Sequence, residues 1–305
     1  MKYAVSHGGL FWNVKFETDR ATQLARLKTV VENRAFAVFS EACFYSFPTL
    51  VKEAKLINPD CQIFVSVNGW GCYDNGSIYW PTHKVMSDIV NKANTWLNDI
   101  NGNPIRTPWA GNLRLFDIRF KETQDAWIDA VKTLFSRYGV SNLLFVDEAY
   151  RSDWVAIKCG YPVNVVPQGN TFNTPTHNWD SAQQRMYRLS QADELIVNGT
   201  TQTDSSAMIT GRYFQNAYQK DPASILSQLK YEHQFSTDGK RKLILQTDGN
   251  IFWQALAQEV NGYVQDSTSF SDVKPMITIA DGLKLEYDIA KRNVQIISPE
   301  VVIAT

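Results

Sequence analysis

Two patterns alternate along most of the chain: short apolar runs and longer amphipathic stretches. The apolar runs are rich in β-branched and aromatic residues, which is typical of buried strands. They lie at residues 3–6, 35–40, 61–67, 113–118, 143–146, 194–197, 207–213 and 242–246. Between them, apolar residues spaced three and four positions apart predict helices at residues 18–32, 47–56, 81–100, 123–138, 181–191 and 222–233. This alternation indicates βα units around a parallel sheet.

Eight predicted strands are the number that a closed barrel needs, and closure leaves no exposed sheet edge. A further helix and strand within residues 251–265 complete the turn, and a length of 305 residues suits one such unit. From residue 272 the pattern changes to three short strands, at residues 276–280, 283–287 and 294–297. We therefore predict an α/β fold with a (β/α)8 TIM-like barrel at residues 1–271 and a small C-terminal β appendage at residues 272–305.

One irregular segment stands out, at residues 150–178, where three prolines interrupt any regular pattern. A loop of this length inside a compact domain is usually functional or disordered. Because it leaves directly from the strand at residues 143–146, we expect it to lie over the C-terminal mouth of the barrel.

Composition narrows the classes of function. The net charge is −1, with 30 basic and 31 acidic residues, so we expect no nucleic-acid partner. No apolar run is long enough to span a bilayer, so we expect no membrane partner. The four cysteines match no zinc or redox spacing, and we expect no cofactor and no metal. The first residues turn polar too soon for a signal peptide, which predicts cytoplasmic synthesis without one.

Residues 96–151, about a fifth of the chain, carry a resemblance. Leu115-Phe116-Asp117 ends a strand, Tyr138-Gly139-Val140 follows a helix, and Leu144-Phe145-Val146-Asp147 ends the next strand. In this order the segments resemble the glycoside hydrolase barrel families related to the endo-α-1,4-polygalactosaminidase group. The chain departs from them at Ser141-Asn142, where those families have Asp-Gly. It also has no carboxylate at residues 211–215, where a further one often stands, so the identity of a second catalytic acid stays open.

The resemblance and the strand ends point to the same carboxylates as candidate catalytic residues: Asp147, Asp117 and Glu148. Barrel active sites form at the C-terminal strand ends. Glycoside hydrolysis needs two carboxylates there, one protonated and one ionised. Side chains alternate along a strand, so only one of Asp147 and Glu148 is expected to face the mouth. The alternative is structural: these acids cap helices or pair with nearby arginines, namely Arg114, Arg119 and Arg151.

Further polar and aromatic residues at predicted strand ends or face loops are candidates for binding substrate. They are His7, Trp12, Glu41, Trp70, Tyr73, Arg119 and Asp248. Aromatic faces suit sugar rings, but they suit core packing equally well. Glu41 and Asp248 are also plausible as caps or turn residues, and a lone histidine such as His7 is often structural.

Two hypotheses from different classes follow. The first is an enzyme that cleaves a glycosidic bond of a polysaccharide or oligosaccharide by carboxylate acid/base chemistry. The second is a non-enzymatic barrel, either a carbohydrate-binding protein or a structural part of a larger assembly such as a phage virion. In that case the C-terminal β segment docks on other protein subunits.

Overall fold

In the computed structural model, the described residues are 10–11, 19–32, 34, 36–76, 80–108, 112–147, 152–166, 179–198, 209–214, 242–246, 263–265, 285–288 and 293–296. For residues 10–11, 147, 152–154, 180, 214 and everything from 242 onward, only the backbone is described. The predicted strands at residues 3–6 and 276–280 and the predicted helix at residues 222–233 lie outside the described residues.

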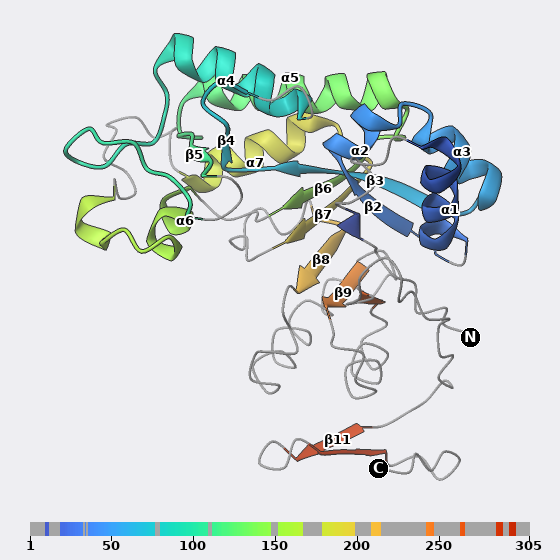
Figure 1. Ribbon diagram of the computed structural model, residues 1–305. Coiled ribbons are helices and arrows are strands. Elements are labelled where there is room, and N and C mark those ends of the chain that lie inside the picture. Colours follow the sequence, from blue (N-terminus) through green and yellow to red (C-terminus); the bar gives the residue numbers. More distant parts are fainter. Residues whose placement is uncertain are drawn as a thin grey trace.

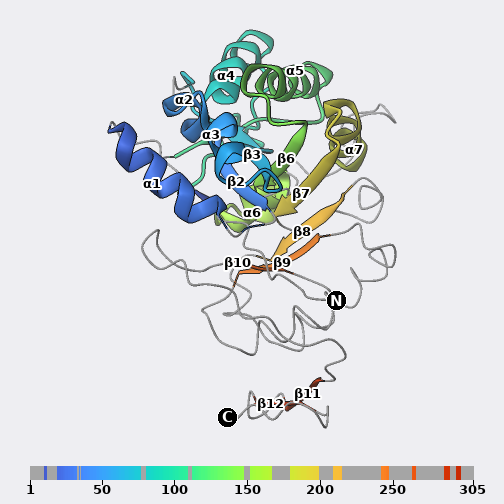
Figure 2. The same cartoon turned by 90° about the vertical axis from the view of Figure 1, so that its right-hand side faces the viewer.

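Eight strands pair side by side, all parallel, in one curled sheet (Figure 2). In spatial order they are β1 (Leu10–Phe11), β2 (Phe36–Ser40), β3 (Gln62–Asn68), β6 (Leu143–Asp147), β7 (Glu194–Asn198), β8 (Gly211–Phe214), β9 (Lys242–Gln246) and β10 (Tyr263–Gln265). The prediction of an α/β fold with parallel strands is confirmed. Closure of the row between β1 and β10 stays a prediction.

The strand predicted at residues 113–118 does not belong to this sheet, and its placement in the barrel is wrong. Here β5 (Arg114–Leu115) pairs antiparallel with β4 (Gly71–Cys72) in a separate two-stranded sheet. The backbone of Leu97 and Ile105 also bonds to Leu115, and bridges join Trp96 to Phe116 and Arg106 to Arg114. These segments, 70–76, 94–108 and 112–118, form a small antiparallel unit that we call the β module. In the row, β3 pairs directly with β6, and β10, the strand predicted within residues 251–265, adds an eighth strand beyond β9.

The β module exists because α4 (Pro81–Ala93) is shorter than the predicted helix at residues 81–100. Asn94 adopts a left-handed conformation, with φ of 54°, and ends the helix. Residues 95–107 are then free to run as an extended hairpin beside residues 113–116. The asparagine stop therefore decides how this whole segment pairs.

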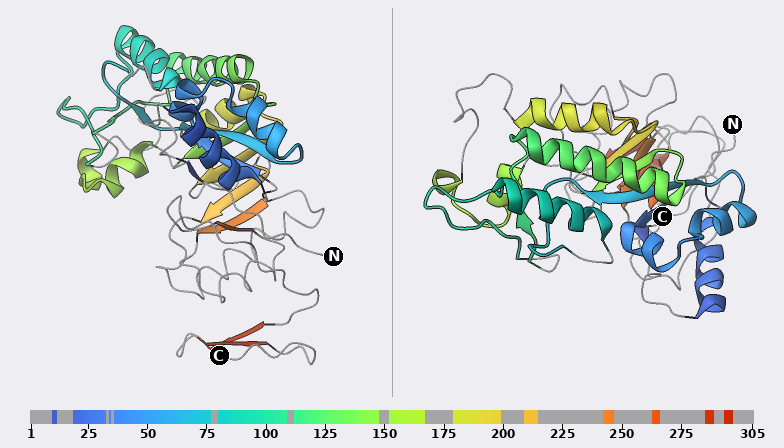
Figure 3. Two further views of the ribbon diagram at one scale, coloured as in Figure 1. Left: turned by 45° about the vertical axis from the view of Figure 1, so that its right-hand side comes forward. Right: turned by 90° about the horizontal axis from the view of Figure 1, so that it is seen from above.

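Helices cover the outer side of the sheet (Figures 1 and 3). They are α1 (Arg20–Val31), α2 (Glu41–Ser46), α3 (Leu50–Ile57), α4, α5 (Lys121–Tyr138) and α7 (Trp179–Ser190). The cap of α5 is Gly139 in a left-handed conformation, as its sequence predicts. Helices α4 and α5 lie side by side with the β module, not a sheet strand, between them in sequence (Figure 3).

Two apolar clusters pack on opposite sides of the strands. The larger one joins β-strand residues such as Val65 and Leu144 to helix residues such as Trp127. The smaller one lies on the inner side of the curl and holds Phe36, Val38, Phe64, Leu143, Phe145, Ile196 and Tyr213. Since strand residues alternate between faces, these two clusters identify the inner row of β2, β3, β6, β7 and β8.

Near the C-terminus, β11 (Leu285–Asp288) and β12 (Asn293–Ile296) form an antiparallel hairpin, close to two of the predicted strands. A separate C-terminal appendage stays a prediction. Among the described residues, no helix is both long and apolar enough to span a membrane.

Candidate functional site at the polar strand ends

The inner row of the sheet changes character at the C-terminal ends of its strands. Lower positions are apolar, as in the inner cluster, whereas the last inner-row positions of β3 and β7 are Ser66, Asn68 and Asn198. In register with them, Asn68 pairs with Asp147 and Asn198 with Tyr213. We call Ser66, Asn68, Asp147, Asn198 and Tyr213 the polar edge. Polar groups over an apolar floor are the usual composition of a ligand site at this end of a parallel sheet.

Asn68 is held by three hydrogen bonds. Its side-chain oxygen accepts from the backbone N–H groups of Trp70 at 2.9 Å and Gly71 at 3.0 Å, which forms a tight turn after β3. Its carbonyl oxygen accepts from the indole N–H of Trp127 on α5 at 2.9 Å. The end of β3 is therefore fixed both by its own turn and by the helix behind it.

This turn passes close to the strand that carries Asp147. A Cβ atom at Gly69 would meet Cγ1 of Val146 at 2.9 Å, so the position requires glycine or a shift of the valine. The turn after β3 and the last residues of β6 thus form one closely packed surface. A site built there is preorganised by the scaffold.

Asp117 and Arg119 lie in the β module and its exit turn, and the structure joins them in one buried ion pair. Asp117 is 3% exposed and Arg119 2% exposed. Oδ1 accepts from Nε at 2.9 Å and from the Arg119 backbone N–H at 3.0 Å, while Oδ2 accepts from Nη2 at 2.6 Å. The guanidinium also stacks 4.5 Å from the ring of Trp179. The expectation that Asp117 ends a strand adjacent to β6 is wrong, because the neighbours of β6 are β3 and β7.

Glu41 follows β2 directly, as predicted, but its carboxylate is fully buried. Oε2 accepts from the backbone N–H of Thr82 at 2.8 Å, and Oε1 accepts from the Thr82 hydroxyl. The carboxylate therefore caps the first turn of α4 from another element. Burial raises the pKa of Glu41 to about 7, against the lowering effect of both bonds to Thr82. Of the two interpretations open from sequence, this geometry supports the cap.

Next to Thr82, His83 is buried between two aromatic rings. Its ring centre lies 5.2 Å from that of Tyr73 and 5.3 Å from that of Trp80. Neither ring nitrogen has a hydrogen-bond partner within the described part of the chain, and burial lowers the pKa of His83 to about 3. Tyr73 therefore packs against a neutral imidazole.

Trp70 does not offer a surface for stacking. It is 1% exposed and belongs to the main core cluster, so its expected role as a sugar platform is wrong. Its backbone carbonyl accepts from Phe116 at 3.1 Å and so joins the turn after β3 to the β module.

The structure describes the remaining candidate site residues only in part. His7, Trp12, Glu148 and Asp248 lie outside the described residues. For Asp147 the backbone is described, as the last residue of β6 in register with Asn68. The sequence did not single out Ser66, Asn68 and Asn198 as site residues, although each continues the inner row that Phe64 in β3 and Ile196 in β7 begin.

The segment after β6 lies on the expected side. Its described part, α6 (Ser152–Lys158) and the turn η2 (Val163–Val165), lies toward the end of the sheet to which β6 and β7 point (Figure 1). It joins the β module, since Ile100 N–H donates to the Val165 carbonyl at 3.0 Å and Arg106 N–H donates to the Tyr161 hydroxyl at 3.1 Å. Within the described residues, no three His, Cys, Asp or Glu side chains gather as metal ligands would.

Comparisons with known proteins agree with this architecture. No family model matches the chain, and no curated protein matches it. Similar solved structures include the α-galactosidase TtGalA from Thermus thermophilus, with a TM-score of 0.54 and 12% identity over 88% of this chain and 60% of that one. The α-N-acetylgalactosaminidase NagBb from Bifidobacterium bifidum has a TM-score of 0.55 and 9% identity over 98% and 56%.

A GH31 family sulfoquinovosidase from E. rectale is also similar, with a TM-score of 0.53 and 11% identity over 82% of this chain and 41% of that one. The chain thus spans between two fifths and three fifths of the length of these proteins. At such low identity the likeness shows the fold alone. The fold is a glycoside hydrolase-like α/β fold with a curled parallel sheet.

Proposed function

We propose that the protein is a carbohydrate-active protein of glycoside hydrolase type, with its site at the polar edge and Asp147 as its principal catalytic carboxylate. The observation that carries this proposal is the position of Asp147. It ends a central strand of the sheet, in register with the fixed Asn68, at the end where proteins of this architecture do chemistry.

The strand period gives a second argument. Positions 143 and 145 of β6 belong to the inner cluster, so position 147 falls in the same inner row. By the same alternation along the chain, we expect Glu148, outside the described residues, to face the other way. Of the two neighbouring acids, Asp147 is therefore the one whose position suits a mouth on the inner side of the curl.

Glycoside hydrolysis requires a second carboxylate. Asp117 and Glu41 are each bound to structural partners. We therefore propose that the partner is Asp248, which comes two residues after β9 in the sequence, with Glu148, next to Asp147 in the sequence, as the alternative. The separation of the two carboxyl groups then sets whether the anomeric configuration is retained or inverted.

Hydrolysis with site variants tests the proposal. p-Nitrophenyl α-D-galactopyranoside, which TtGalA binds, and a panel of polysaccharides with reducing-end detection are suitable substrates. Asp147→Asn is nearly isosteric and removes one ionisable oxygen, so we expect turnover to fall by orders of magnitude with an unchanged melting temperature. Asp193→Asn is the matched control, because Asp193 is exposed just before β7 at the opposite sheet edge. Equal activity of both variants would contradict the assignment.

One observation favours a second function, carbohydrate binding without hydrolysis. Both oxygens of Asp117 and both oxygens of Glu41 are engaged in holding the fold together, which removes two of the predicted acids from chemistry. In that case glycans bind with or without Asp147, and no substrate of the panel is cleaved. The comparisons give no support to the phage-virion alternative.

A further inference from the structure

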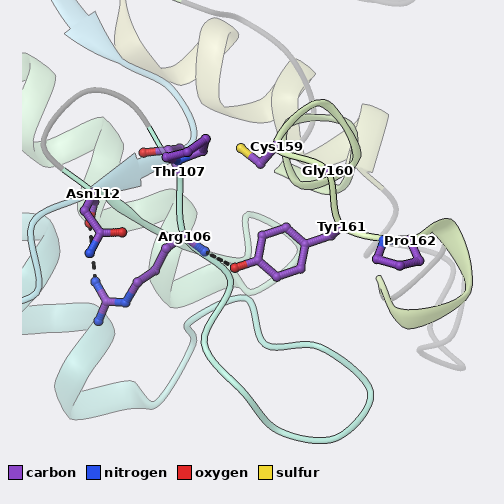
Figure 4. Close-up of a pocket in the computed structure, with 8 residues that line it drawn as sticks. Arg106, Thr107, Asn112, Cys159, Gly160, Tyr161 and Pro162 are labelled. Carbon is purple, nitrogen blue, oxygen red and sulfur yellow. Dashed lines mark hydrogen bonds between the residues drawn. The ribbon is translucent and has the colours of Figure 1, made fainter.

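The β module and the segment after α6 together line an open pocket on the surface (Figure 4). Its volume is about 430 Å³, and it is lined by Arg106, Thr107, Pro108, Asn112, Cys159, Gly160, Tyr161 and Pro162. Pockets that bury small ligands measure about 300–1,000 Å³, so this one has the size of a binding site. None of its residues belongs to the polar edge.

Arg106 holds the walls of the pocket together. Its backbone N–H donates to the Tyr161 hydroxyl at 3.1 Å, and Nη1 donates to the Asn112 carbonyl at 3.3 Å. Its Nη2 forms an ion pair with Asp74. Through its backbone and its side chain, this one residue contacts three other segments, and the pocket is formed before any ligand arrives.

These contacts also decide what charge the pocket accepts. The Arg106 cation is already matched by the Asp74 carboxylate, and two of its guanidinium nitrogens already donate within the protein. An anionic ligand would therefore gain little from this arginine. A neutral ligand needs no unmatched cation in the pocket, so these contacts favour a neutral ligand.

The remaining lining suits a hydroxylated ring. Pro108, Pro162 and the ring of Tyr161 offer apolar faces for C–H bonds. The Tyr161 hydroxyl accepts one hydrogen bond and keeps its own proton to donate. The side-chain amide of Asn112, an exposed residue, has no hydrogen-bond partner within the described part of the chain and supplies both a donor and an acceptor.

We propose that this pocket is an accessory binding site for a neutral sugar unit of the glycan, separate from the polar edge. The choice of a sugar rests on the proposed function, while the pocket itself does not. Bound there, a second unit of the chain would hold a polysaccharide against the mouth and raise its effective concentration at Asp147.

Cys159, which lines the pocket, can report whether the pocket is occupied. Of the four cysteines, Cys43, Cys61 and Cys72 are buried, and Cys159 alone is partly exposed, with its sulfur pointing toward Thr107 across the pocket (Figure 4). A thiol reagent should therefore label the folded protein at Cys159, and a ligand in the pocket should slow that reaction. Peptide mass spectrometry gives the rate at this residue, and Cys159→Ala gives the background.

The experiment measures maleimide labelling of the full chain with galactose, N-acetylgalactosamine, maltose, galacturonate or sorbitol at about 50 mM, enough to fill a site with a Kd of ~1 mM. We expect at least one neutral sugar to slow labelling severalfold, with galacturonate and sorbitol without effect. Asn112→Gly should weaken protection about threefold to tenfold, since it removes the amide but keeps the carbonyl and the left-handed backbone.

Asn94→Gly is the matched control, because Asn94 is also left-handed but caps α4 outside the pocket. It should leave protection unchanged. Equal loss in both variants, labelling that no sugar slows, or stronger protection by galacturonate would each overturn the proposal. In Asp147→Asn, the sugar should slow labelling of Cys159 as much as in the original chain. A failure of the proposed catalytic role at the polar edge and a failure of the pocket proposal therefore give different results.

Discussion

Glu41 and His83 are both buried at the start of α4, and burial shifts their pKa values in opposite directions. A raised carboxyl pKa means that the folded state prefers the protonated acid, whereas a lowered imidazole pKa means that it prefers the neutral base. The pKa shift of Glu41 therefore adds to the free energy of unfolding at low pH, and that of His83 adds to it at high pH. The two effects oppose each other in mildly acidic solution.

Replacing Glu41 by glutamine separates them. The folded pKa is about 7 against a model value of 4.5, so the contribution of Glu41 is fully present below pH 4.5 and is lost as the pH rises to about 7. Relative to the original chain, Glu41→Gln should gain about 3 kcal/mol of unfolding free energy between pH 4.5 and pH 8. Urea unfolding at several pH values measures this difference.

The control for that experiment is Glu122→Gln, an exposed glutamate in the first turn of α5. Its difference from the original chain should stay nearly constant with pH. A Glu41→Gln curve parallel to that of the original chain would mean that Glu41 is already ionised in its site near Thr82. In the variant, His83 acts alone, and stability should fall as the pH drops below 6.5.

At the scale of elements, local patterns predicted most strands and helices within a few residues, because each apolar run packs both faces of a covered parallel sheet. The pattern at residues 113–118 has the same composition as a sheet strand, and no periodicity distinguishes the two placements. What decided it was Asn94, which ends α4 and frees a hairpin to pair with this segment.

The same limit applied to the site. An apolar run followed by an acid selects Asp147 from the sequence, and its catalytic role stays a prediction. The same pattern also selected Asp117. In the structure, Asp117 follows β5, a strand of the separate two-stranded sheet, and forms an ion pair with Arg119, two residues away. The arginine two residues after Asp117 was visible in the sequence, and it supported the structural alternative, an ion pair with a nearby arginine. Ser66, Asn68 and Asn198 carry no such signal, because a strand end is located only when the register is known.

Breaking the buried pair should cost stability. Asp117→Asn removes the charge that compensates Arg119, and an uncompensated buried charge costs about 3–5 kcal/mol. Asp88→Asn breaks the exposed pair with Lys84 and should cost under about 0.5 kcal/mol, since solvent screens that pair. Thermal unfolding measures both. A catalytic Asp117 would give the reverse result, lost hydrolysis with the melting temperature of the original chain.

At the scale of the whole molecule, the sheet is a set of layers. Apolar residues fill the inner row through most of its height, and polar groups occupy its last layer. The β module and the segment after β6 rise from neighbouring strands at this same end and are joined by Arg106, Tyr161 and Ile100. The polar edge and these two segments therefore lie at one end of the sheet, whereas the helices cover its outer side.

This architecture predicts that the chain folds without its C-terminal hairpin. The sheet reaches its eighth strand at residue 265, and within the described residues β11 and β12 pair only with each other. A chain ending at residue 271 keeps every strand of the curled sheet, so we expect one cooperative thermal transition within about 3 °C of that of the full chain, a shift that corresponds to about 1 kcal/mol in a large domain. Differential scanning calorimetry of both chains measures it, and Cys159 labelling checks that the pocket survives. A truncated chain that is insoluble or that labels at Cys43, Cys61 and Cys72 would show that residues 272–305 belong to the barrel unit and not to a separate appendage.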